Sequence, residues 1–547
     1  MEVDVHTIVI LLVATQFVIS AAATLGSRFK IPAPLILVLA GISVSLVPGA
    51  PEMVLDPTIV TLGLLPPLLY ASAAAIPAMN FRREFRAING LSVVLVILSS
   101  LALGALFAWL IPDLGFVWGA ALGAVLSPTD AAATSLFKGQ GVPSRVTVIL
   151  EGESLLNDAT ALIALRTAVV ATTLGFSVWP TIGNFVLSVG VAVFFGVLAA
   201  KLNLAIRSRV HDEAVNTILS FTTPFAAALP AEMLHGSGLV AAVVAGIVIG
   251  MRARRVLPPG HRVSDMQNWA TLQLSLEGVV FLTMGLQLST ILRKLSVESV
   301  GVTQGIVMAG LALLALLAVR CLYVAPLLWS LRRDTQRKQA RQPEFVAIQR
   351  ELEAGRIPEP IARRARRQNP GPEETLVDRL VSRGRRHLAD LDYLTSQPLG
   401  LAEAAVVIWA GMRGAVTVAA VQLLPAGAPH RPLLVFIAFA VATMSLLVQG
   451  GTIGIVAKWL FPSSINEVEE DASRAERARI RALLDATRVP HSEDMSGKEH
   501  SLALCRARRI ALLDAADEGI FSADALALAL RDLDIDELVL ELRSGEA

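Results

Sequence analysis

Long apolar stretches alternate with short polar segments along the chain. Most of these stretches hold about 20 residues with few charges, which is the length a helix needs to cross the hydrocarbon core of a bilayer. The pattern predicts an all-α polytopic membrane protein with about 13 transmembrane helices. The predicted spans are residues 7–25, 34–49, 56–77, 90–111, 115–137, 145–174, 180–205, 213–233, 236–252, 269–291, 302–330, 402–424 and 431–461.

The composition favours the same class, because 54% of the 547 residues are hydrophobic and only 17% are charged. Glu2 and Asp4 precede the first apolar stretch, which we therefore expect to be a retained span and not a cleaved signal. The eight histidines show no zinc-type spacing, and Cys321 and Cys505 lie in very different surroundings. We expect no cofactor, no disulfide and no nucleic-acid partner.

The basic residues of the short loops predict the orientation of the chain. They follow the odd-numbered spans, with exceptions at Arg293, Lys294 and Arg431. Because basic loops stay in the cytoplasm, the pattern predicts a multi-pass protein of the plasma membrane with an external N-terminus and a cytoplasmic C-terminus. The basic residues that carry this argument are Arg28, Lys30, Arg82, Arg83, Arg86, Lys138, Arg145, Arg207, Arg209, Arg252, Arg254, Arg255 and Arg262.

An odd number of spans allows two inverted halves. If the seventh span is a linker, the two flanking sets of six helices have opposite topology, as in inverted-repeat transporters. The fifth span of each half is interrupted by a helix breaker and a charge, in LSPTDAAA (126–133) and GMRGAVTV (411–418). Broken helices at matching positions of two halves point to a transport site.

Two polar regions lie outside the spans. Residues 331–398 form a basic cytoplasmic insert within the predicted transmembrane domain of residues 1–462, and residues 463–547 form a cytoplasmic tail. Both regions have helical patterns. The tail is either a solvated extension or a regulatory element that lies on anionic lipid. The helical stretches are residues 343–354, 374–393, 472–487, 500–517 and 521–543.

The sixth span carries polar side chains in LEGESLLNDATALIALR (150–166). Asp158 lies about 20 Å along the helix from Arg145, near the middle of the membrane, where a charge is costly and usually functional. Ser154 precedes Asn157 by three residues and Asp158 by four, so all three can share one face of a helix. Their hydroxyl, amide and carboxylate oxygens suit a small hard cation.

The broken fifth span offers further oxygen atoms. Pro128 removes a backbone donor and frees nearby carbonyls, while Thr129 adds a hydroxyl and Asp130 a carboxylate. The predicted cation and proton site therefore consists of Asp158, Asn157, Ser154, Thr129 and Asp130.

Two arginines lie within apolar surroundings, Arg320 in the eleventh span and Arg413 at the break of the twelfth. A buried arginine needs a partner, and Glu153 and Asp130 are the candidates. We expect Glu153, Arg320 and Arg413 to form a structural ion pair in the core. The pattern leaves open whether Glu277 and Arg166 have a functional or a structural role.

The motifs SPTDAAA, LEGESLLNDATAL and GMRGAVTVAA resemble those of monovalent cation:proton antiporters of the sodium/proton exchanger type, in their prokaryotic NhaP-like branch. The likeness covers residues 7–461 outside the 331–398 insert. It implies a homodimer that exchanges Na⁺, Li⁺ or K⁺ for H⁺. It also implies a core domain of spans 4–6 and 11–13 and a dimerisation domain formed by the other spans.

The resemblance assigns roles residue by residue. Asp158 corresponds to the carboxylate that carries the ion and the proton, with Asn157 as its motif partner. Thr129 and Ser154 correspond to coordinating oxygens, and Glu153 with Arg320 to the core ion pair. The chain departs from the pattern at Ala71, where many members carry an acidic residue after LPPLL and an aromatic residue.

These patterns favour a secondary transporter over an enzyme. With one titrating carboxylate in the site, we expect electroneutral exchange of one cation for one proton. Two alternatives stay open: a transporter of another small ion such as an anion, and a membrane sensor or channel. ATP-driven pumping is disfavoured, because the chain contains no phosphate-binding motif of the type G-x-x-x-x-G-K-[ST].

Overall fold

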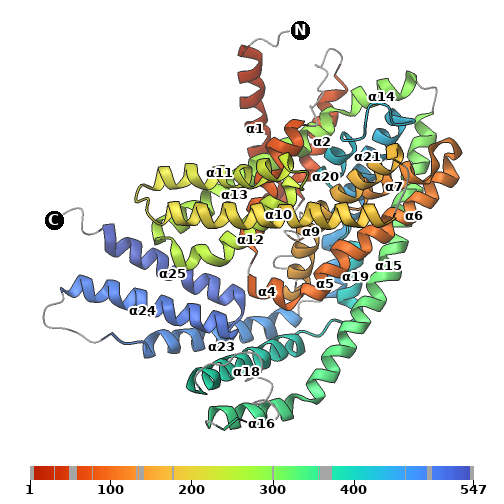
Figure 1. Ribbon diagram of the computed structural model, residues 1–547. Coiled ribbons are helices and arrows are strands. Elements are labelled where there is room, and N and C mark those ends of the chain that lie inside the picture. The colour runs from red at the N-terminus through yellow and green to blue at the C-terminus, as the bar shows by residue number, and fades with distance from the viewer. Residues whose placement is uncertain are drawn as a thin grey trace. The chain divides into compact units, whose positions relative to one another are not determined.

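The structure is a computed structural model, and all regular secondary structure in the residues that it describes is helical (Figure 1). This confirms the predicted all-α class. The described residues are 5–29, 31–47, 58–76, 78–130, 134, 141–174, 178–297, 301–354, 356–357, 373–461, 464–489 and 496–542.

The chain divides into two compact units. The first comprises Met1–Leu257, Ser264–Pro326 and Ala402–Ser463, and the second comprises Pro258–Val263, Leu327–Leu401 and Ser464–Ala547. Residues 131–133 and 135–137 of the fifth predicted span lie outside the described residues. Helices that lie wholly or mainly in the first unit occupy the described part of every range predicted to span the membrane. They are α1 (Val5–Phe29), α2 (Ala33–Ser45), η1 (Ile59–Leu64), α3 (Leu65–Ala75), α4 (Ala78–Arg83), α5 (Phe85–Asn89), η2 (Gly90–Val94), α6 (Leu95–Leu110), η3 (Pro112–Leu114), α7 (Gly115–Leu126), α9 (Ser144–Leu174), α10 (Val178–Arg207), α11 (Glu213–Met233), α12 (Gly238–Val256), α13 (Pro259–Leu286), α14 (Leu288–Val297), α15 (Val302–Ala340), α19 (Leu401–Trp409), α20 (Ala415–Val421), α21 (Arg431–Ser445), η4 (Leu446–Gly450) and α22 (Gly451–Leu460).

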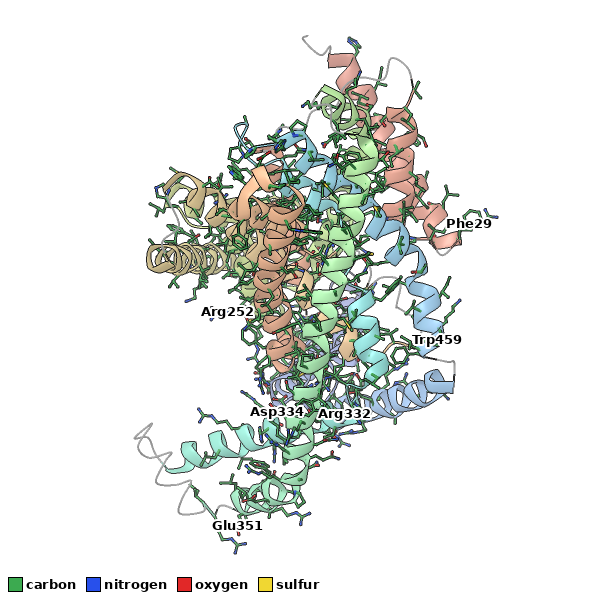
Figure 2. All side chains as sticks on the ribbon, turned by 90° about the vertical axis from the view of Figure 1, so that its right-hand side faces the viewer. Phe29, Arg252, Arg332, Asp334, Glu351 and Trp459 are labelled. Atoms are coloured by element: carbon green, nitrogen blue, oxygen red, sulfur yellow. The ribbon has the colours of Figure 1, made fainter. Side chains whose placement is uncertain are left out.

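Seven of the described helical segments are long and apolar enough to cross a membrane, and shorter apolar helices accompany them. Large apolar side chains cover the outside of the first unit, where lipid replaces water as the solvent. Phe29 and Trp459 are 61% and 81% exposed, and Figure 2 shows both side chains projecting outward. The chain is therefore a multi-pass membrane protein, and the count of 13 spans stays a prediction.

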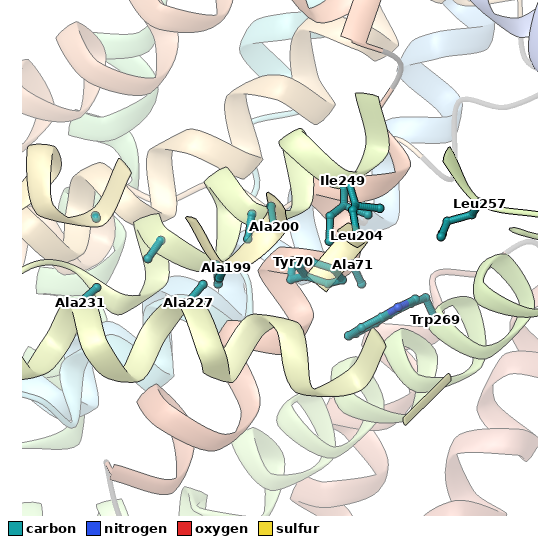
Figure 3. Packing of buried hydrophobic residues seen from close by; sticks show 14 residues of the cluster. Tyr70, Ala71, Ala199, Ala200, Leu204, Ala227, Ala231, Ile249, Leu257 and Trp269 are labelled. Atoms are coloured by element: carbon teal, nitrogen blue, oxygen red, sulfur yellow. The ribbon is translucent and has the colours of Figure 1, made fainter. Parts of the chain in front are cut away.

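The helices of the first unit pack in two groups. In the site group, α7 packs against α6, α9, α20 and α21. In the scaffold group, α12 packs against α3, α10 and α11, and Trp269 of α13 joins their apolar core (Figure 3). Small residues allow this close packing, since a Cβ atom on Gly246 of α12 would lie 2.6 Å from the carbonyl oxygen of Tyr70 in α3.

Two basic residues that the loop pattern placed at the membrane surface are buried. The Arg207 side chain is fully buried in the scaffold group, where it forms an ion pair with Asp265 and donates to Asn216 Oδ1 over 2.7 Å. Arg145 Nε lies 2.5 Å from Glu84 Oε1, and both side chains are buried. Arg145 and Arg207 each have a carboxylate partner, because an unpaired charge in such a buried position would be strongly destabilising.

The second unit contains α16 (Gln342–Glu353), α18 (Glu373–Ser396), α23 (Ser464–Ala486), α24 (Gly497–Glu518) and α25 (Ala523–Leu542). These helices confirm the predicted helical stretches of the insert and the tail. Asp534 of α25 accepts hydrogen bonds of 2.6 Å from both Arg509 of α24 and Arg262. Two helices extend well beyond their predicted spans. Helix α13 begins at Pro259, ten residues before the predicted start at residue 269. Helix α15 continues past residue 330 to Ala340, because its last residues are mostly good helix formers.

Candidate cation site at two broken helices

The first break follows α7, which ends at Leu126, and residues 127–130 are not helical. Pro128 has no backbone N–H to continue the helical hydrogen bonds. The Ser127 hydroxyl donates to the Gly123 carbonyl over 2.8 Å and so closes the last turn. The break leaves the Thr129 side chain buried at 6% exposure.

The second break lies between α19 and α20, at residues 410–414. Two side chains, one from α21 and one from η4, form hydrogen bonds with buried backbone groups of this break. The Arg413 N–H donates to Ser445 Oγ over 2.8 Å, and Gln449 Nε2 donates to the Trp409 carbonyl over 3.0 Å. An interrupted helix is stable inside a membrane only when such partners replace the lost hydrogen bonds.

The two breaks meet although they are far apart in the sequence. The Asp130 N–H donates to the Met412 carbonyl over 2.8 Å. Gly414 lies directly against the Asp130 carboxylate, since a Cβ atom on Gly414 would lie 1.6 Å from Asp130 Oδ2. Glycine leaves room for this carboxylate, which a side chain at position 414 would displace.

We expect Gly414→Ala to reduce transport on the order of tenfold to a hundredfold, because the added methyl group displaces the Asp130 carboxylate from the crossing of the breaks. Initial rates of ion exchange in vesicles measure the effect. Gly451→Ala is the matched control, since nothing lies within 4 Å of a Cβ atom at Gly451. Equal rates for the two variants would contradict this role of Gly414.

Helix α9 brings the carboxylates and the amide to the first break. Glu153, Asn157 and Asp158 are 1%, 1% and 5% exposed. Asn157 Nδ2 donates to Thr129 Oγ1 over 2.6 Å, and Thr129 Oγ1 donates to Glu153 Oε1 over 3.1 Å. Thr129 therefore joins the break to two consecutive turns of α9. Ser154 is also buried and precedes Asp158 by one turn of the same helix.

Glu153 forms a buried ion pair with Arg320 of α15 through both carboxylate oxygens. Arg320 Nε and Nη2 also donate to the Val407 carbonyl of α19 over 3.0 Å and 2.9 Å. The Arg320 side chain also packs closely against Gly411 of the second break, where a Cβ atom would lie 2.5 Å from Arg320 Nε. This pair connects α9, α15 and α19.

Arg413 does not join this ion pair, contrary to our expectation. Its Nη1 donates to the Gly411 carbonyl over 3.0 Å, and within the described chain its Nε has no hydrogen-bond partner. The reason is that Arg320 already occupies both oxygens of Glu153. Arg413 remains buried, at 3% exposure, as a positive charge beside the second break.

Some buried oxygen atoms at the breaks have no hydrogen-bond donor within the described part of the chain. Among the described residues, Asp158 Oδ1, Asn157 Oδ1 and Thr417 Oγ1 are buried and have no hydrogen-bond partner. Leaving such a group unsatisfied costs about 1–3 kcal/mol, and more when it is charged. Carboxylate, amide and hydroxyl oxygens are ligands of hard cations, so a monovalent cation or a proton can satisfy these atoms.

Sequence reasoning missed Ser445 and Gln449, which support the second break. It treated Gly411 and Gly414 only as helix breakers and missed their close approach to Arg320 and Asp130. Ser445 and Gln449 are two polar residues four positions apart within an apolar stretch, and that spacing could have indicated a shared buried role. Within the described residues, no group of three His, Cys, Asp or Glu side chains could hold a metal ion.

Two broken helices that cross beside a buried carboxylate define a secondary transporter. The particular family follows from comparison with known proteins. The chain belongs to the sodium/hydrogen exchanger family, whose transmembrane model matches residues 13–350 and 376–459. The members of this family are secondary transporters and not enzymes. The match includes residues 331–350 and 376–398, so it covers most of the region that we treated as an insert and leaves out only residues 351–375 of it.

Individual relatives and a solved structure agree with the family. An uncharacterised Na⁺/H⁺ exchanger of Mycobacterium tuberculosis is 28% identical over 488 residues, which cover 87% of this chain and 79% of the relative. A sodium, potassium, lithium and rubidium/H⁺ antiporter of Bacillus pumilus is 29% identical over 51% of this chain and 43% of its own length. The sodium proton antiporter MjNhaP1 of Methanocaldococcus jannaschii shares the fold, with a TM-score of 0.57 and 16% identity over 83% of this chain and 98% of that chain.

Proposed function

We propose that this protein exchanges a monovalent cation for H⁺ across the plasma membrane by competition of the two ions for Asp158. Na⁺ is the first candidate, and Li⁺ and K⁺ are alternatives that the name of the Bacillus relative supports. The observation that carries the proposal is a pair of buried oxygen atoms, Asp158 Oδ1 and Asn157 Oδ1, that have no hydrogen-bond partner among the described residues of this member of the exchanger family.

The hydrogen bonds suggest how the site works. Asn157 uses its amide N–H₂ group to hold Thr129, so its carbonyl oxygen is available beside Asp158. Deprotonated Asp158 binds the cation together with Asn157 Oδ1, Ser154 and Thr129. Protonation makes Asp158 neutral and releases the cation, so one site serves both ions.

The neighbouring charges have positioning roles. Glu153 with Arg320 holds α9 against the second break, and Arg413 and the carboxylate of Asp130 adjust the local charge beside the site. The transported ion reaches each side of the membrane in turn when the site group moves against the scaffold group. The protein needs no cofactor for this cycle.

The proposal also covers the domains of the chain, its orientation in the membrane and its dimer. Residues 1–462 form the transmembrane antiporter domain, with an external N-terminus, and residues 463–547 form a cytoplasmic tail. The scaffold group provides the contact of a homodimer within the lipid bilayer. The basic loops support the orientation.

Dye-monitored proton flux in everted membrane vesicles tests the function. Na⁺, Li⁺ and K⁺ are added separately to respiring vesicles with and without the protein. We expect at least one of these cations to cause proton movement that depends on the protein. No response to any cation in correctly inserted protein would favour the anion transporter or the sensor instead.

We expect exchange to be electroneutral, because Asp158 is the titrating group of the site and gives up one proton for each cation that binds. In proteoliposomes, cation uptake driven by a pH gradient should then be unchanged by a K⁺ diffusion potential set with valinomycin. Na⁺ is the transported cation in this assay. A rate that follows the membrane potential would contradict one-for-one exchange while leaving antiport intact.

A further inference from the structure

An ion pair connects the two helix groups of the first unit. Arg166 Nη2 of α9 lies 2.6 Å from Glu232 Oε1 of α11. Helix α9 belongs to the site group and carries Asp158, while α11 belongs to the scaffold group. Gly238 of α12 leaves room for the glutamate, since a Cβ atom there would lie 2.8 Å from Glu232 Cγ.

A second polar contact also joins the groups. Gln422 Nε2, at the end of α20, donates to Gln287 Oε1 at the junction of α13 and α14 over 3.2 Å. The Gln287 side chain is buried, at 6% exposure. This hydrogen bond therefore connects the second broken helix to the scaffold group.

Both contacts lie on the same side of Asp158. Arg166 is eight residues beyond Asp158 in α9, about 12 Å along the helix axis. In the proposed orientation, α9, α11, α13 and α20 all end toward the outside of the cell. The four residues of the two contacts therefore lie between Asp158 and the external solution.

The Arg166–Glu232 ion pair is suited to opening. Its side chains are 49% and 25% exposed, whereas those of the Arg320–Glu153 pair are 2% and 1% exposed. Partly exposed ion pairs contribute little to stability because water competes for both charges. The outer pair can form and break during transport, while the inner pair stays intact.

We propose that the Arg166–Glu232 ion pair and the Gln287–Gln422 hydrogen bond form an external gate, which is closed in this structure and opens when Asp158 faces the outside. The proposal rests on the antiport function proposed above, because it needs the two helix groups to move in each cycle. It adds a role for Arg166 and Glu232 that is separate from ion binding.

Reversible cross-linking tests the gate. The double variant Arg166→Cys/Glu232→Cys is made in a background of Cys321→Ser and Cys505→Ser, which removes the two native cysteines. Cysteine side chains are shorter than those of Arg and Glu, so a bis-methanethiosulfonate reagent with a short spacer is used to link the two cysteines. We expect cross-linking to lower Na⁺-driven proton flux to background and a reducing agent to restore it.

The two single-cysteine variants, treated with the same reagent, are the controls and keep their rate. Cross-linked protein that exchanges ions at the unlinked rate would overturn the gate. If the untreated background protein moves no protons with any cation, the antiport function itself fails, which is a different result.

Charge reversal provides a second measurement. Arg166→Glu places two carboxylates against each other and favours the open state. We expect the apparent affinity for external Na⁺ to change up to about fivefold, and the swap Arg166→Glu/Glu232→Arg to return it to the original value. Equal affinities for the single variant and the swap would count against the gate.

Discussion

Asp158→Asn is expected to abolish cation-driven proton flux. The amide has nearly the shape of the carboxylate, so the packing of α9 is retained. It carries no charge to attract a cation and no proton to exchange, so each half of the cycle fails. Proton flux after addition of Na⁺, Li⁺ or K⁺ to everted vesicles should fall to the level of vesicles without the protein.

The matched control for this variant is Asp113→Asn, which makes the same chemical change at an exposed position in η3. It should exchange ions at the rate of the unchanged protein. Equal amounts of each variant in the membrane must be shown by immunoblot. Residual exchange in Asp158→Asn at the rate of the control would exclude Asp158 as the shared site.

Arg320→Met is expected to produce the largest loss of stability. It removes the partner of Glu153 and also both donors to the Val407 carbonyl. Breaking a buried ion pair by removing one partner costs about 3–5 kcal/mol, because the other charge is left unpaired. Thermal unfolding in detergent, followed by size-exclusion chromatography after heating, should show a much lower midpoint.

Two comparisons give this result its meaning. Arg166→Met removes a partly exposed ion pair and should cost about 0–1 kcal/mol. The double variant Glu153→Leu/Arg320→Met should recover part of the lost stability, because no unpaired charge remains. An Arg320→Met variant as stable as Arg166→Met would contradict a structural role for the buried pair.

The fold class could be predicted because the length of apolar stretches limits the chain to membrane-spanning helices. The positions of both breaks could also be predicted, because Pro128 and the glycines around Arg413 interrupt otherwise apolar helices. Local sequence carries this information, since helix breakers act within one turn.

Partner choice could not be predicted in the same way. Arg207 looks like a loop residue at the end of a span, and its partner Asp265 is 58 residues away. Likewise, Arg320 and Arg413 were both candidates for Glu153, and only the folded structure, in which Arg320 of α15 reaches Glu153, decides between them. Such pairs depend on tertiary geometry, which a charge pattern does not specify.

The central claim is that one cation displaces one proton at Asp158. The most direct measurement adds Na⁺ to purified protein in weak buffer and records bound cation and released protons together. The account predicts about one proton for each cation bound, and neither binding nor release for Asp158→Asn. Cation binding without proton release, or unchanged release from the variant, would contradict it.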